Sequence, residues 1–346
     1  MLALSITPSV FAEEPVGGTT IYVDAINGND TQEGVGTTSD KAYKTVAKAV
    51  AAAKSGDTIQ LSEGNYTLYG VSSKGHTKGK NLTFVGRGTD KTGWNIGAEV
   101  PDPTNYGTEY NGDYSFDGAG TIAFKNMTLR SGKADYLGFI RANNTIVENC
   151  VINGKTFYWG YTSATFSNTT FNCPNGDYAI WTYSSPVMTF DNCTFKSSGK
   201  VINVYTDAGA GKHDITVNFN GCTVENSGPS LKPVLNINDS NMGNYKYVIS
   251  ISGDNVVNGV NTDKITCSRL FGYGGKSENN TGRTIVNFGN TTVWQDGKMV
   301  DAKAYHNSGV TADGVTYDND VDGSNNSLHA EGYKDCLLYT SDAADD

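Results

Sequence analysis

The sequence predicts an all-β protein, a right-handed parallel β-helix (a solenoid of stacked coils) with a short N-terminal capping helix. Three observations predict this class. The 346 residues include 41 Gly and 35 Asn, two turn-forming types that are unfavourable inside helices. A short β motif recurs five times between Phe124 and Val224, at the spacing typical of a solenoid. No segment of helical periodicity separates one copy from the next.

The two ends are expected to lie outside the folded domain. Residues 1–12, MLALSITPSVFA, form an apolar stretch that reads as the remnant of an export signal. We therefore expect a secreted or cell-surface protein, with the capped β-helix over residues 13–300. Residues 301–335 are interpreted as a C-terminal extension or linker. Residues 336–346, CLLYTSDAADD, match the in-frame translation of a sequencing adapter, so we expect the natural chain to continue beyond Asp335 with a different sequence.

A cap is expected ahead of the coils. Residues 21–24 read as a strand, and residues 42–54, AYKTVAKAVAAAK, read as an amphipathic helix of about three turns. Its apolar face carries Val46, Ala49, Val50 and Ala53, and Gly56 is placed to end it. A helix in this position covers the open edge of the first coil, which would otherwise invite aggregation.

The repeated motif consists of two short β runs joined at a corner. The corner residues are Asn126, Asn149, Asn168, Asn192 and Gly221, which follow one another at similar but unequal intervals. Asn tolerates the left-handed backbone region better than other non-glycine residues, so we expect it to turn the chain there. Cys150, Cys193 and Cys222 follow three of these corners. We expect them to stack inside the solenoid as small buried hydrophobes.

The N-terminal part of the chain resembles a known superfamily. The segments IYVDAINGNDTQEG, AYKTVAKAVAAAKSGDTIQLSEGNYTL and NLTFVGRGTDKT lie between residues 21 and 92. They resemble the opening of secreted bacterial β-helix proteins of the pectate-lyase-like superfamily, including family 9 polysaccharide lyases. The resemblance implies the fold and export. It does not imply one reaction, because a single fold hosts many functions.

The catalytic motifs of that superfamily are missing from the sequence. Residues 261–263, Asn-Thr-Asp, occur without the other motifs of galacturonan hydrolases, and Ile285 stands where pectin methylesterases have their nucleophile. A lyase would need several carboxylates from adjacent coils to hold Ca²⁺ and a Lys or Arg base. A cluster of oxygen ligands for Ca²⁺ does exist, but its spacing favours an Asx-turn; its members are Asp24, Asn27, Asn29 and Asp30. We therefore predict no catalytic residue and no required cofactor, with Ca²⁺ possible.

Charge limits the classes of partner. The formal net charge of −10 and a pI near 4.9 leave no basic field for nucleic acid or an anionic membrane. No segment approaches the roughly 18 apolar residues that a transmembrane helix needs. We expect a monomer whose ligand is a polysaccharide or a glycoprotein.

The candidate ligand-binding residues form an aromatic ladder. A constant offset between coils aligns Trp159 and Tyr161 with Trp181 and Tyr183, and these with Asn203 and Tyr205. Ile180 aligns with Ile202 and should face the core, so strand alternation predicts that the rings face outward. A register slip of one residue would instead turn them inward. The candidate site comprises Trp159, Tyr161, Trp181, Tyr183, Tyr205, Arg141 and Asp207.

Exposed rings in a row could stack on sugar rings or anchor a protein partner, which makes ligand binding the first functional hypothesis. The second is a polysaccharide lyase or glycoside hydrolase acting on a pectin-like polymer in the same groove, with Arg141 and Asp207 as catalytic candidates. The third is a passive stalk. Substitution of Trp181 should abolish binding in the first case, substitution of Asp207 should abolish cleavage in the second, and neither should matter in the third.

Overall fold

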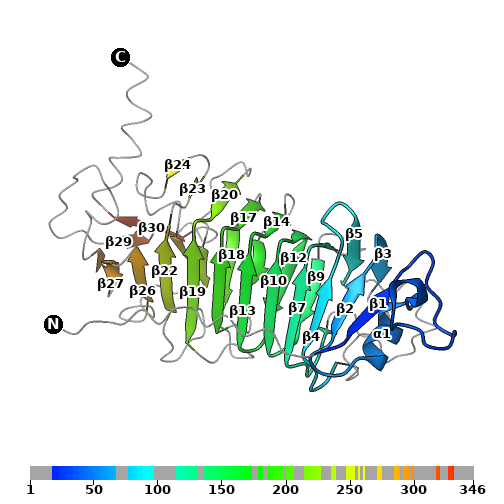
Figure 1. Cartoon of the computed structure of the whole chain (residues 1–346). Helices are drawn as coiled ribbons and strands as arrows, with labels where there is room; N and C mark the ends of the chain where they lie inside the picture. Colours follow the sequence, from blue (N-terminus) through cyan, green and yellow to red (C-terminus); the bar gives the residue numbers. More distant parts are fainter. Residues whose placement is uncertain are drawn as a thin grey trace, which may run out of the picture.

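The computed structural model shows an elongated stack of strands that starts at β1 and α1 (Figure 1). It describes residues 18–67, 77–96, 114–130, 136–173, 178–181, 186–197, 200–205, 214–226, 235–238, 247–253, 256–257, 260–261, 271–274, 284–288, 291–295, 298–299, 317–319 and 326–330. The predictions for residues 1–12 and 336–346 lie outside this part of the chain. Only two short strands are described within residues 301–335.

The strands are arranged in three sheets, which we call A, B and C. Sheet A contains, in order, β1 (Thr20–Val23), β2 (Thr58–Leu61), β4 (Leu82–Val85), β7 (Thr121–Lys125), β10 (Asn144–Glu148), β13 (Ser163–Ser167), β16 (Val187–Asp191), β19 (Ile215–Asn220), β22 (Tyr247–Ser252), β26 (Thr284–Phe288), β27 (Thr291–Gln295) and β28 (Lys298–Met299). Sheet B contains β3 (Gly64–Thr67), β5 (Thr92–Asn95), β8 (Thr128–Arg130), β11 (Val151–Asn153), β14 (Thr170–Cys173), β17 (Thr194–Ser197), β20 (Thr223–Asn226), β23 (Val256–Val257) and β24 (Val260–Asn261). Sheet C contains β6 (Tyr114–Ser115), β9 (Tyr136–Ile140), β12 (Lys155–Trp159), β15 (Tyr178–Trp181), β18 (Lys200–Tyr205), β21 (Leu235–Asn238), β25 (Phe271–Gly274), β30 (Asn326–Ala330) and β29 (Tyr317–Asn319).

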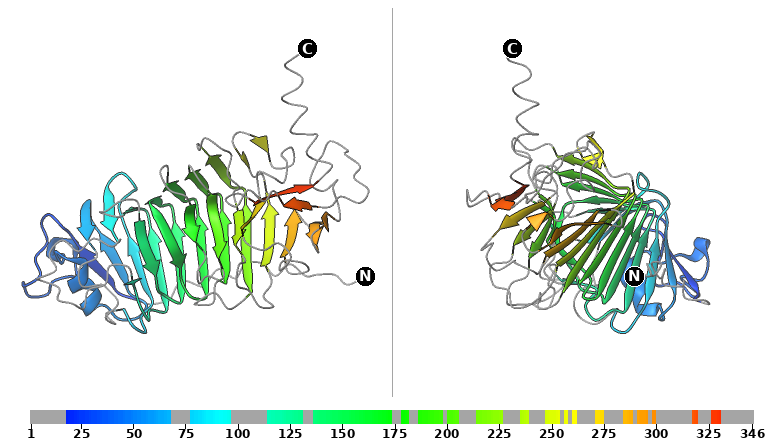
Figure 2. Two further views of the ribbon diagram at one scale, coloured as in Figure 1. Left: turned by 180° about the vertical axis from the view of Figure 1, so that it is seen from behind. Right: turned by 90° about the vertical axis from the view of Figure 1, so that its left-hand side faces the viewer.

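From β4 to β21 each coil contributes one strand to each sheet, and the strands of successive coils pair in parallel (Figure 2). In sheet A this holds from β1 to β26, after which β27 and β28 pair antiparallel. The same change occurs at β24 in sheet B and at β30 in sheet C. The predicted right-handed parallel β-helix is confirmed.

The corners between sheets A and B form as the sequence predicts. Asn126, Asn149, Asn168 and Asn192 have φ between 47° and 56°, and Gly221 has φ 58°. This left-handed conformation strains most side chains, and Asn and Gly are the residues that adopt it most readily. The side-chain amides also bond along the stack, since Asn192 Nδ2 donates to Asn168 Oδ1 at 2.7 Å. Asn or Gly therefore recurs at this position because the backbone conformation of the corner favours these two residues.

The capping helix is shorter than predicted. Helix α1 spans Val46–Ala52, seven residues, and Thr45 caps it by accepting a hydrogen bond from the Lys48 amide. It packs on β1 through Val46, Ala49 and Val50, as expected. Ala53 is already extended, so Gly56 does not end the helix. Two backbone amides of the following turn are instead bonded elsewhere: Lys54 donates to the Asp57 carboxylate and Gly56 donates to the Asn81 carbonyl.

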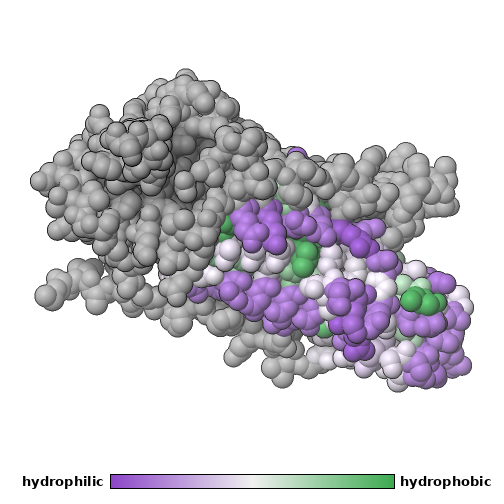
Figure 3. Space-filling view, turned by 90° about the horizontal axis from the view of Figure 1, so that it is seen from above, coloured by the Kyte–Doolittle hydropathy of each residue, from purple (hydrophilic) through white to green (hydrophobic). Residues whose placement is uncertain are grey.

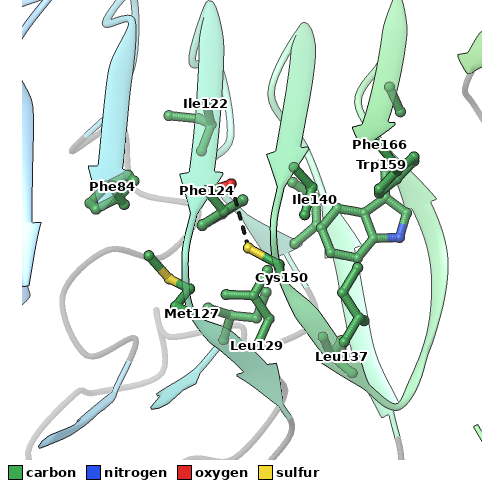
Figure 4. Packing of buried hydrophobic residues seen from close by; sticks show 14 of the residues in the cluster. Phe84, Ile122, Phe124, Met127, Leu129, Leu137, Ile140, Cys150, Trp159 and Phe166 are labelled. Atoms are coloured by element: carbon green, nitrogen blue, oxygen red, sulfur yellow. Dashed lines mark hydrogen bonds between the residues drawn. The ribbon is translucent and has the colours of Figure 1, made fainter. Parts of the chain in front are cut away.

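The interior is filled by columns of identical or similar side chains from successive coils. Phe166, Phe190 and Phe219 stack with centroids 5.0 and 5.4 Å apart and nearly parallel planes. Phe171 and Phe195 form a second column at 4.8 Å. Figure 4 shows part of this core, where the Cys150 thiol donates to the Phe124 carbonyl.

The corner cysteines point inward as predicted. Cys150, Cys193 and Cys222 are all buried, and burial raises the pKa of the Cys150 thiol to about 12. Thr169 occupies the same corner position in the coil between Cys150 and Cys193, and its hydroxyl donates to the Ser167 carbonyl at 2.9 Å. The column thus accepts any small side chain that can bond to a nearby carbonyl.

Candidate functional site

The predicted aromatic ladder does not exist as a continuous exposed row. Trp159 is fully buried, and its ring lies edge-on to Phe166 with centroids 5.4 Å apart. Figure 4 shows it inside the solenoid between strands of neighbouring coils. The expectation that Trp159 faces a ligand is therefore wrong, and this residue belongs to the core.

The error has a physical cause in strand β12. Its register against β9 shifts twice, so Thr156 and Trp159 both point inward although Phe157 and Tyr158 lie between them. The step to the next coil is also longer here, because Thr156 pairs with Ile180, whereas Ile180 pairs with Ile202 after a shorter stretch of chain. An alignment at the shorter, constant offset with strict alternation therefore fails at β12.

The next step of the alignment is confirmed. Ile180 pairs with Ile202 and Trp181 pairs with Asn203, and Ile180 is buried. The side chains of Trp181 and Tyr205 are not among those described, although their backbones lie in β15 and β18. Tyr183 and Asp207 lie outside the described residues.

Tyr161 and Arg141 meet at the turn from sheet C to sheet A, which we call the C–A corner (residues 141–143 and 160–162). Arg141 Nε donates to the Tyr161 hydroxyl, and its guanidinium carbon lies 5.6 Å from the centre of the Tyr161 ring. Gly160 makes the turn possible, because its φ is 91° and a β-carbon would lie 2.7 Å from the Ser163 carbonyl oxygen. Two predicted residues from successive coils are thus brought together.

Asp117, which the sequence did not single out, completes this cluster. Its carboxylate lies 3.1 Å from Arg141 Nε, and it comes from the coil before. The side chains of Arg141 and Asp117 are 28% and 34% exposed, so solvent reaches both. The corner therefore presents a cation whose position is held by an acid and a phenol.

The acidic cluster near the N-terminus is structural. Asp24 Oδ1 accepts hydrogen bonds from the amides of Ile26 and Asn27, which confirms the Asx-turn. Asp30 accepts from the amides of Lys44 and Thr45 and from the Thr45 hydroxyl. These carboxylates hold the cap in shape.

A groove lies on the opposite side of sheet A, at its corner with sheet B. Its volume is about 540 Å³, and we call it the corner groove. Its wall comes from four successive coils and comprises Gln60, Val85, Gly86, Arg87, Gly88, Thr89, Asn126 and Asn149. The sequence predicts only a turn of the backbone at Asn126 and Asn149, and no motif in it singles out Arg87.

One signal for the groove was present in the sequence. The link from sheet A to sheet B is two residues long at Asn126 and Asn149, but six residues, Gly86 to Lys91, join β4 to β5. A longer loop at one corner of a regular solenoid marks a local departure from the repeat. Gln60, Asn126 and Asn149, which line the groove from other coils, lie in segments of regular length, so the sequence gives no comparable signal for them.

Three further properties of the described residues concern metal ligands, membrane-spanning helices and surface hydropathy. Within the described ranges, no group of three or more His, Cys, Asp or Glu residues could hold a metal ion. The described helices include none that is long and apolar enough to cross a membrane. On the side of sheet B, the coloured residues of Figure 3 are mostly hydrophilic, with small separated hydrophobic patches.

Comparison with known proteins adds a partial match. Residues 26–73 match the model of a family described as a protein of unknown function, DUF1565. This segment contains α1, β2 and β3, and thus the capping helix and the two strands that follow it, but not β1. The search of curated proteins found no match.

Proposed function

We propose that this chain is an exported or cell-surface β-helix protein that binds a glycan, free or carried by a glycoprotein, at the C–A corner. The observation that carries the proposal is the Arg141–Tyr161–Asp117 cluster. A guanidinium fixed by two neighbours loses little side-chain entropy when it donates to a ligand. A partly exposed tyrosine ring beside it suits a ligand surface that is apolar on one face and hydroxylated at its edges, as sugar rings are.

The fold supports such a role. Parallel strands fix the spacing of the coils at about 4.8 Å, so side chains at the corner are held on a rigid scaffold. Sheet C continues beyond the corner through β15 and β18, where Trp181 and Asn203 lie side by side in the backbone register. A polymeric ligand could therefore contact several coils at once.

The test is size-exclusion chromatography of the full chain with a panel of plant, mucin and bacterial polysaccharides. The proposal predicts co-elution with at least one polymer of unchanged length. The Tyr161→Ala variant should weaken this binding about tenfold, because one good aromatic contact is worth about 1–1.5 kcal/mol. Thr162→Ala, an exposed neighbour on the same turn, is the matched control and should bind like the wild type.

Two outcomes would contradict the proposal. Shortened polymer would make the protein an enzyme, in line with the lyase or hydrolase hypothesis. Absence of binding to every glycan would direct attention to protein ligands or to a passive stalk.

A further inference from the structure

We propose that the corner groove is a binding site for an oxyanion, a carboxylate or a sulfate ester, carried by a hydroxylated polymer. The central contact would be the guanidinium of Arg87. This site is separate from the C–A corner and does not depend on Tyr161.

Arg87 differs from the other basic residues near it. Lys91 and Lys125 each have a carboxylate oxygen within 3.3 Å. Arg87 is exposed, and within the described part of the chain its side chain forms no ion pair and no hydrogen bond. Asp90, the acid of the same loop, does not line the groove. In a protein of net charge −10, this is a cation left available for an anionic ligand.

The loop that carries Arg87 is held firmly against the next coil. The amides of Gly86 and Gly88 donate to the carbonyls of Lys125 and Asn126, at 2.8 and 3.0 Å. The Arg87 amide donates to the Thr92 hydroxyl. A β-carbon at position 86 would lie 2.4 Å from the Asn126 carbonyl oxygen, so only glycine permits this approach. The backbone under Arg87 is thus organised before any ligand arrives.

The opposite wall offers side-chain amides that bond to none of the described residues. Further along the stack, Asn192 and Asn168 bond to each other through their side chains. At the groove, the side-chain amides of Asn126 and Asn149 form no such bond to any described residue. They supply donors and acceptors for the oxyanion and for neighbouring hydroxyl groups.

Gln60 fixes the remaining wall. Its amide nitrogen donates to the Val85 carbonyl at 2.9 Å, which directs the carbonyl oxygen of the side chain away from that bond. The lining therefore combines the guanidinium of Arg87 with side-chain amides that can donate and accept hydrogen bonds. A planar or tetrahedral oxyanion can accept two parallel hydrogen bonds from the fork, which a neutral hydroxyl cannot do.

The experiment compares three polymers that share one backbone: dextran, carboxymethyl dextran and dextran sulfate. The full chain is titrated with each by isothermal calorimetry at fixed salt concentration, because electrostatic binding depends on salt. The proposal predicts binding to at least one of the charged polymers and not to dextran. Binding to only one of them identifies the oxyanion as carboxylate or sulfate.

Variants then locate the site. Arg87→Gln should weaken binding at least about tenfold, and Arg87→Lys should weaken it less, because lysine keeps the charge but loses the fork. Lys196→Gln, which removes the same charge from an exposed side chain on β17 outside the groove, should change binding less than about twofold. Asn149→Gly keeps the backbone that Gly221 adopts naturally and removes one amide; it should weaken binding roughly two- to tenfold.

Three results would overturn the inference: equal losses in Arg87→Gln and Lys196→Gln, equal binding to dextran, or no binding to either charged polymer. If the groove proposal fails, the proposal of glycan binding at the C–A corner still stands, provided that neutral polymers bind and that Tyr161→Ala weakens their binding. Conversely, the C–A corner proposal would be contradicted if the glycan that co-elutes with the full chain lost its binding in Arg87→Gln and kept it in Tyr161→Ala.

Discussion

Replacement of Phe190 by alanine should be among the most damaging single changes in this protein. The side chain is fully buried on β16, and its ring lies between those of Phe166 and Phe219 at 5.0 and 5.4 Å. Phe171 and Phe195 also contact it edge-on, at 5.8 and 5.2 Å. Removing it breaks one aromatic column and leaves a cavity inside a solenoid whose backbone spacing is fixed by the sheets, so the walls cannot collapse easily.

The magnitude follows from these contacts. Burial of Phe is worth about 3–5 kcal/mol in Phe→Ala series, and four ring neighbours place this site at about 4–5 kcal/mol. Stacked coils do not always unfold in one step, so the assay is native-state hydrogen exchange, which reports the free energy of local opening for each coil. The loss should be largest in β13, β16 and β19.

The matched control is Val187→Ala, on the same strand. Val187 is 41% exposed, so its truncation should change the free energy of unfolding by less than about 0.5 kcal/mol. A loss below about 2 kcal/mol for Phe190→Ala, or equal losses in the two variants, would refute the idea that the aromatic columns hold the coils together.

Three further predictions follow from single residues. Asn192→Val should lower stability by about 1–2 kcal/mol, because φ is 50° there, whereas Asn192→Gly should cost less; equal melting temperatures would contradict the backbone argument. When the pH is raised from 8 to 10.5, the free energy of unfolding should fall by about 2 kcal/mol more in the wild type than in Cys150→Ser, as measured by urea unfolding at both pH values. Burial holds the pKa of the Cys150 thiol at about 12 against 9.0 in the unfolded chain, so only the unfolded state loses its proton in this interval; parallel pH curves would exclude this cause. Trp159→Ala should lower the free energy of unfolding by about 3–5 kcal/mol, and Tyr161→Ala should lower it by about 1 kcal/mol or less. Only Tyr161→Ala should therefore lose binding while it stays folded. Thermal melts of the two variants test this.

The corners and the core columns could be predicted because their causes are local. A left-handed corner strongly favours Asn or Gly at one position, and this preference repeats in five successive coils, from Asn126 to Gly221. Short alternating strands between corners then assign the inward side chains. The inward position of Cys150 follows from its place directly after a corner.

The site could be predicted only in part, because it depends on contacts between coils. Whether Trp159 faces inward depends on shifts in the pairing of β12 with β9, which the sequence of β12 alone does not indicate. Tyr161 and Arg141 were grouped correctly, but Asp117 was missed because it lies one coil earlier. The corner groove joins Gln60 to Asn149 across coils of unequal length, so regular spacing could not bring these residues together.

The central claim, that the C–A corner binds a glycan without cleaving it, is tested most directly by one binding measurement. The polysaccharide that co-elutes with the full chain is titrated against wild type, Tyr161→Phe and Tyr161→Ala by calorimetry, and its chain length is checked afterwards. The account predicts uncut polymer, a small loss for Tyr161→Phe, which keeps the ring, and about a tenfold loss for Tyr161→Ala. Equal affinity in all three proteins, or a shortened polymer, would contradict it.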